Sequence, residues 1–221
     1  YYEFQELTPL GSEGDVMIQR LADRLASIDL LGRAAKLLEH QVTYRLKGQE
    51  KSRIGARLAV IYLLDSKPAE ALDVLQRTKT AGLPPALEAE RRYPEARALA
   101  ATGQAEAALS LLGNDDSGAA ELLRADIFWR DRRWADAAKT AQSVLGERWR
   151  GEAPLSPREQ TQVVQIAVSL YMSDNIAKLR ELQRQYGQKM TDGPYSETFH
   201  LLTQRVDLSK TEFRQLAGEI A

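Results

Sequence analysis

The hydrophobic residues of this chain recur every three or four positions, which is the period of a helix buried on one face. In the segment 16–42 the apolar stripe consists of Ile18, Leu21, Ala22, Leu25, Leu38 and Val42. In the segment 57–76 it consists of Leu58, Ile61, Tyr62, Leu72 and Leu75. The alternation of a half-buried strand is almost absent. The pattern therefore predicts an all-α protein, preceded by an extended N-terminal arm over residues 1–14.

Residues that favour helix starts stand between the apolar segments. Ser156 can cap a helix N-terminus, with Pro157 at the first helical position and Glu159 completing a capping box. Ser209 and Glu212 have the same spacing near the end of the chain. These residues predict helix starts at both places.

Gly82, Gly103 and Gly187 stand where helices could end in a left-handed residue. Pro94 lies inside a segment that is helical throughout by pattern, and proline removes a helical hydrogen bond. We therefore expect a kink or a restart at Pro94. The arginines and carboxylates around it, in "LEAERRYPEAR", are interpreted as a solvated face with pairs at i,i+4.

The helical segments are copies of one unit. Each copy has a small alanine in its first helix, and these starting alanines are Ala22, Ala59, Ala96, Ala125 and Ala167, separated by 37, 37, 29 and 42 residues. Three positions later each copy has a bulky residue: Leu25, Tyr62, Leu99, Phe128 and Leu170. Twelve positions after the start stands a small or apolar residue: Ala34, Ala71, Ala108, Ala137 and Leu179. This spacing predicts helical hairpins whose paired helices approach closely at the alanines.

The sixteenth position after each starting alanine is less regular. It is leucine in the first three copies, the smaller Ala141 in the fourth, and Gln183 in the fifth, where Leu182 stands one step early.

One hairpin cannot bury its apolar face alone, so neighbouring copies must stack.

The segment "GARLAVIYLLDSKPAEALDVLQRTKTAGLPP" (55–85) resembles a tetratricopeptide repeat (TPR), with the alanine–tyrosine pair in the first helix and an alanine in the second. Residues 94–112 and 123–145 are similar to further units. The resemblance implies a right-handed solenoid of about five antiparallel helical hairpins, in a single domain over 15–221. Its expected units are 15–51, 52–86, 87–117, 118–155 and 156–221. Copies of 29, 37 and 42 residues, against the usual 34, imply lengthened helices or inserted loops.

The composition and the motifs exclude several kinds of functional site. The formal charge is −1, and there is no cysteine, which excludes disulfides and thiolate metal sites. The two histidines, His40 and His200, lack a metal-ligand spacing and are interpreted as surface or hydrogen-bonded residues. We find no phosphate loop, dinucleotide loop or nucleophile elbow. The sequence therefore predicts a non-enzyme with no cofactor, metal or small-molecule substrate.

No apolar run reaches the roughly 18 residues that span a bilayer, so we expect no membrane insertion by this segment. Cytoplasm and periplasm are both compatible with the composition. The chain starts at Tyr1 and is interpreted as part of a longer protein.

The stretch "FWRDRRWADAAKTAQSVL" (128–145) combines aromatic and basic residues. In the repeat register Asp131, Arg132 and Arg133 fall in the turn between two helices. Trp134 falls at the ninth position after the starting alanine, where the other copies have Leu31, Pro68, Ala105 and Ile176, and it is therefore interpreted as a packing residue. Trp129 lies one position off the core stripe. It either lines a groove formed by the first helices or packs on the adjacent hairpin.

The resemblance implies a non-catalytic scaffold that binds a peptide or a partner protein in its concave groove. The groove candidates are Arg53, Arg57, Tyr93, Arg97, Asp126, Trp129 and Arg130. The tryptophan, tyrosine and arginine types among them are enriched in binding hot spots. The lysine and asparagine with which some members of the family hold a C-terminal carboxylate are absent. A structural spacer within a larger repeat protein is the alternative. Nucleic-acid binding through residues 124–150 is a weaker one, because acids interleave with the basic residues there.

Overall fold

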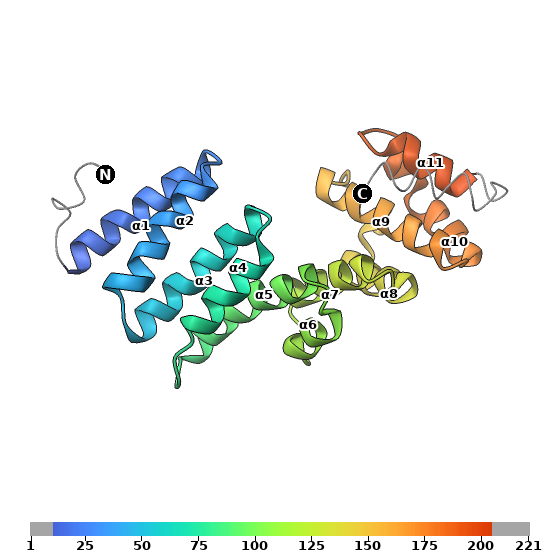
Figure 1. Cartoon of the computed structure of the whole chain (residues 1–221). Coiled ribbons are helices and arrows are strands. Elements are labelled where there is room, and N and C mark those ends of the chain that lie inside the picture. Colours follow the sequence, from blue (N-terminus) through green and yellow to red (C-terminus); the bar gives the residue numbers. More distant parts are fainter. Residues whose placement is uncertain (1–10, 205–221) are drawn as a thin grey trace. The chain divides into compact units, whose positions relative to one another are not determined.

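The computed structural model describes residues 11–204, which form eleven α-helices and no strand. The first ten helices follow one another as antiparallel pairs, and α11 follows the last pair (Figure 1). The contacts divide the chain into two compact units on either side of the junction between Asp115 and Asp116. The predicted arm lies largely outside the described residues, as do Ser209 and Glu212. The first helix already begins at Ser12, so residues 12–14 are helical and not part of an extended arm.

The first unit contains three hairpins. They are α1 (Ser12–Ser27) with α2 (Leu31–His40), α3 (Gly48–Leu64) with α4 (Pro68–Arg77), and α5 (Pro85–Ala101) with α6 (Ala105–Leu112). A π-helix, η2 (Gln41–Arg45), follows α2. Ile18, Ala22, Leu38 and Val42 are fully buried, with Leu21 and Leu25 packed against them, as the apolar stripe predicted.

The second unit contains two hairpins and one further helix. They are α7 (Gly118–Arg130) with α8 (Trp134–Leu145), α9 (Pro157–Met172) with α10 (Ile176–Tyr186), and α11 (Ser196–Gln204). Short 3-10 helices, η3 (Arg148–Arg150) and η4 (Gly187–Met190), precede α9 and follow α10. Phe199 of α11 is fully buried in the core of this unit. The sequence pattern did not separate α11 from the fifth hairpin.

All five hairpins turn in the same way at the same position of the repeat. The residue seven positions after each starting alanine has a positive φ, between 56° and 80°: Asp29, Ser66, Gly103, Arg132 and Asp174. The next N–H bonds back to the carbonyl five residues earlier, at 2.8–2.9 Å in every hairpin. This is the Schellman closure of a helix C-terminus. The second helix then starts nine positions after the alanine, at Leu31, Pro68, Ala105, Trp134 and Ile176. The predicted register is therefore confirmed in all five copies.

The differences in repeat length arise outside this turn. The 29-residue spacing reflects short helices, eight residues in α6 and thirteen in α7. The 42-residue spacing reflects the connection between α8 and α9, which contains η3. Arg148 holds this connection by bonding to Glu159 at 2.7 Å and to the carbonyl of Pro154 at 2.9 Å.

Several helix ends agree with the sequence and two do not. Ser156 and Glu159 form the predicted capping box. The Ser156 N–H hydrogen bond, followed by Arg148, lowers the pKa of the Glu159 carboxyl. Gly103 has a positive φ in the turn that follows α5. Gly82 also has a positive φ, but α4 already ends at Arg77, and Gly187 has φ −51° and begins η4, so the helix ends predicted at Gly82 and Gly187 are wrong. Helix α5 continues without interruption through Pro94, so no restart occurs.

The interpretation of "LEAERRYPEAR" as a solvated face is wrong for Arg91, which is buried. Its guanidinium donates to the carbonyls of Ser52 and Leu75 and, at 3.2 Å, to Thr78 Oγ1. The last carbonyls of a helix have no partner within it and form the negative end of its dipole, so the C-terminus of α4 compensates this buried cation. Arg91 thus joins α5 to the two helices before it. Burial lowers its pKa.

Candidate functional site

A small hollow in the second unit contains Trp129. Helix α8 packs against both α7 and α9, and side chains of all three helices line the space between them. We call it the Trp129 hollow. Its lining residues are Leu122, Ala125, Asp126, Trp129, Ala137, Ala141, Gln162, Gln165 and Ser169. Its volume is about 60 Å³.

Trp129 stands in the last turn of α7 and is half-buried. Its ring meets the ring of Trp134 edge-on, with centroids 5.2 Å apart and planes at 84°. Trp134 is the first residue of α8 and is also half-buried, which agrees with the packing role inferred from its repeat position. An edge-to-face aromatic pair adds about 0.5–1.5 kcal/mol beyond area burial. Trp134 therefore fixes the orientation of Trp129 within its own hairpin.

Asp126 and Arg130 stand one turn apart on α7, next to Trp129. Arg130 Nε bonds Asp126 Oδ2 at 3.1 Å, and both side chains are about half exposed. Such an exposed i,i+4 pair stabilises the helix by only about 0.3–0.5 kcal/mol. Its main effect here is that Arg130 neutralises Asp126, the one charged residue that lines the hollow.

The other four groove candidates lie in the first unit, on the neighbouring helices α3 and α5. Arg53 pairs with Glu50, and Arg57 pairs with Asp23 of α1. The hydroxyl of Tyr93 donates to Asp115 at 2.8 Å. Arg97 is exposed on α5. The structure thus brings Asp126, Trp129 and Arg130 together on α7 and places the remaining candidates in the other unit.

The basic residues of 124–150 do not form an unpaired stripe. Five of the seven have carboxylate partners within 4 Å: Arg124, Arg130, Arg133, Arg148 and Arg150. Arg133 also lies over the Phe128 ring at 4.5 Å, and Arg150 lies over Trp149 at 4.9 Å. Phosphate binding would have to displace these pairs, which weakens the nucleic-acid alternative.

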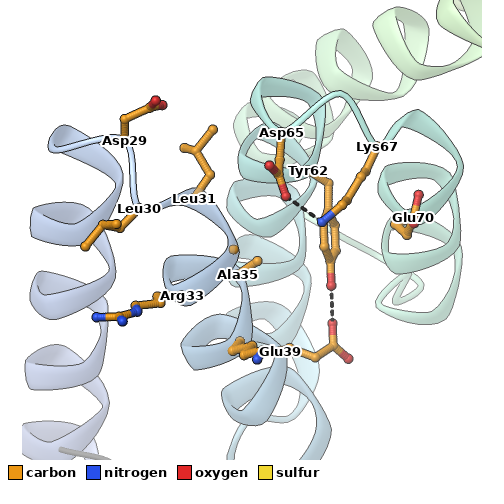
Figure 2. Close-up of a pocket in the computed structure, with 12 residues that line it drawn as sticks. Asp29, Leu30, Leu31, Arg33, Ala35, Glu39, Tyr62, Asp65, Lys67 and Glu70 are labelled. Carbon is orange, nitrogen blue, oxygen red and sulfur yellow. Dashed lines mark hydrogen bonds and ion pairs between the residues drawn. The ribbon is translucent and has the colours of Figure 1, made fainter.

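A larger cleft of about 580 Å³ lies in the first unit, between the α1–α2 turn, α2, and the α3–α4 hairpin. Figure 2 shows its charged lining, with Arg33 on α2 and Asp65, Lys67 and Glu70 on the opposite side. Tyr62 donates to Glu39 at 3.1 Å, and burial together with Glu39 raises the pKa of Tyr62 to about 12. Charges of both signs line this cleft and leave it without a dominant sign.

Among residues 11–204 no group of three histidine, cysteine, aspartate or glutamate residues is placed to hold a metal ion. No helix in this range is long and apolar enough to cross a membrane. Both histidines differ from expectation. Each is half-buried, and Nδ1 of each is buried without a hydrogen-bond partner among the described residues.

No family model and no curated protein sequence matches the chain. Two solved structures match it in fold. One is the Q17M crystal structure of the nearly identical TPR-like repeats of a Podosopora anserina kinesin light chain; it has a TM-score of 0.59 and 19% identity, over 86% of this chain and 95% of that one. The other is a crystal structure of the same repeats, with a TM-score of 0.59 and 18% identity, over 79% of this chain and 94% of that one. The chain therefore has a TPR-like helical-repeat fold, as its sequence predicted.

Proposed function

We propose that this chain is a non-catalytic protein–protein interaction scaffold that binds a peptide or partner protein at the Trp129 hollow. The observation that carries the proposal is the hollow itself. It presents a half-buried tryptophan, held by a second tryptophan, beside small residues on the next helix. Stacked helical repeats supply extended surfaces of this kind. The TPR-like fold supports a scaffold role in general, and the hollow supports this location in particular.

Trp129 is suited to anchor a partner. Tryptophan is enriched among the residues whose truncation costs an interface most, because it buries a large area with few rotatable bonds. Its edge contact with Trp134 limits its freedom before binding, which reduces the entropy lost when a partner docks.

A second candidate function is a spacer that packs on further repeats. Val16 and Met17 of α1 favour it, since they are 44% and 42% exposed on the first helix of the first hairpin. Exposed apolar side chains on a repeat helix are the surface that another repeat would cover. Both functions are compatible in one chain, because Val16 and Met17 lie in a different unit from Trp129.

The test compares Trp129→Ala with Tyr44→Ala, a matched aromatic truncation at a side chain that is 77% exposed in the first unit. Peptides are selected on the full chain from a random displayed library, and the affinity of an enriched, labelled peptide is measured by fluorescence anisotropy. We expect Trp129→Ala to weaken binding at least tenfold while Tyr44→Ala leaves it unchanged. If Trp129→Ala lowers only the melting temperature, its role is packing and the proposed site is wrong.

A further inference from the structure

The fourth hairpin has alanine where the first three have a core leucine. Leu38, Leu75 and Leu112, sixteen positions after the starting alanine, are at most 2% exposed. Ala141 has the same repeat position on α8 but is half-buried and lines the Trp129 hollow. Ala125, the starting alanine, is half-buried as well, although the other four starting alanines are fully buried. The hollow therefore exists because the repeat departs from its own pattern here.

We propose that this space is a specificity socket. It takes one short aliphatic side chain from an extended, uncharged peptide segment of the partner. The inference rests on the proposed function and adds to it the chemistry of the peptide and the residue that selects it, Ala141.

The volume sets the size of the inserted group. An apolar cavity of about 150 Å³ holds a benzene molecule, so a space of about 60 Å³ accommodates a side chain of a few heavy atoms. Alanine and valine fit this description, whereas an aromatic ring does not. The methyl groups of Ala125, Ala137 and Ala141 and the indole of Trp129 give an apolar lining for such a group.

The charges of the lining residues also determine which peptide charge the hollow favours. Helix α9 has no charged residue from Gln160 to Met172, in a chain that is 28% charged. It contributes Gln162 and Gln165 to the hollow, and their amides can donate to and accept from a peptide backbone. Asp126, the one charged residue of the lining, is already paired with Arg130.

A charged side chain would lose its hydration in this lining without gaining an opposite charge, which makes its burial unfavourable. A neutral segment meets neutral walls and amide hydrogen-bonding groups. The charge distribution therefore favours an uncharged peptide over an acidic or a basic one. It also predicts weak dependence on salt, because screening acts on charge pairs.

The experiment uses the full chain and the displayed random peptide library. The variant Ala141→Leu restores the leucine of the other hairpins and fills the socket. The variant Ala135→Leu adds the same side chain to the same helix at an exposed position outside the hollow and is the matched control. Affinities of an enriched peptide are measured at low and high salt, together with the melting temperature of each variant.

We expect the enriched peptides to share a short aliphatic residue in an uncharged stretch. Ala141→Leu should weaken binding at least tenfold, which corresponds to about 1.4 kcal/mol, without lowering the melting temperature. Ala135→Leu should leave the affinity unchanged, and salt should change it less than twofold. Replacing the shared aliphatic residue of the peptide by glycine should reproduce the loss on the unmodified chain, so the proposal stays testable if Ala141→Leu folds poorly.

The outcomes separate this inference from the proposed function. If Trp129→Ala abolishes binding but Ala141→Leu and the glycine peptide do not weaken it, the site stands and the socket is wrong. Enriched peptides that are charged and bind in a salt-sensitive manner would also overturn the socket. If no peptide is enriched, or if binding is indifferent to Trp129→Ala, the proposed function fails, and the socket fails with it.

Discussion

Replacement of Arg132 by glycine is expected to stabilise the protein. Arg132 is exposed and has φ 58° in the turn between α7 and α8. A side chain with a β-carbon pays about 1–2 kcal/mol in the left-handed region, whereas glycine loses about 0.5–1 kcal/mol more conformational freedom on folding. The difference is a gain of about 0.5–1 kcal/mol in the free energy of unfolding. The hydrogen bonds that close the turn, from Arg132 N to Trp129 O (3.1 Å) and from Arg133 N to Phe128 O (2.8 Å), are backbone bonds that glycine preserves.

Gly103 provides the reciprocal experiment at the same repeat position. It has φ 80°, and a β-carbon added to it would meet no atom within 4 Å. Gly103→Ala should therefore lower the free energy of unfolding by about 0.5–1 kcal/mol, the same difference with the opposite sign. Both variants are compared with the unmodified chain by urea unfolding followed by circular dichroism. If Arg132→Gly is neutral or destabilising while Gly103→Ala is destabilising, the Arg132 side chain has a stabilising role that outweighs the strain, and the reasoning is refuted.

Three further predictions concern the structural framework. Gly55→Ala should lower the free energy of unfolding by about 1–3 kcal/mol in urea unfolding, although alanine favours helix, because the new β-carbon would lie 2.6 Å from Thr78 Cβ and 2.8 Å from Thr78 Cγ2; an unchanged midpoint would show that the helices separate at no cost. Arg91→Met should destabilise by about 1–3 kcal/mol because it leaves the carbonyls of Ser52 and Leu75 without their buried donor; equal stability would mean that water satisfies them. Glu159→Gln should destabilise by less than about 1 kcal/mol at pH 7. Since the pKa of Glu159 is lowered in the folded state, this difference is present above the unfolded value of about 4.3 and should vanish as the pH falls through the folded value; a difference that persists at lower pH would exclude the carboxylate as its cause.

Most of the fold could be predicted from the sequence because small residues mark where paired helices touch. Alanines twelve positions apart placed four of the five turns, and Ala167 with Leu179 placed the fifth. Four of the five left-handed turn residues are not glycine and offered no local signal. The left-handed helix end predicted at Gly187 is wrong for the opposite reason, since glycine permits a positive φ without requiring one. Arg91 could not be predicted to be buried, because its compensation comes from carbonyls of residues far away in the sequence.

The candidate site was predictable in part. The repeat register singled out Trp129 and assigned Trp134 to a packing position, and Ala141 was visible as a departure from the leucine pattern. The edge contact between the two tryptophan rings was not predicted. The contribution of Gln162 and Gln165 was not visible, because it depends on how α9 packs against α8 after a connection of unusual length. The repeat pattern thus marks Trp129 as a residue off the core stripe, but it does not show which side chains of the next hairpin face it.

The uniform turn has a consequence for how such a chain can change in length. Within every hairpin the spacing from the starting alanine to the second helix is fixed by backbone hydrogen bonds, so an inserted or deleted residue there would rotate one helix face out of contact. The connections at 78–84, 113–117 and 146–156 differ in length among the same hairpins. We therefore expect that whole hairpins can be duplicated, removed or exchanged as units when the chain is joined at these connections. A cut inside a turn would instead disrupt both of the helices that it joins.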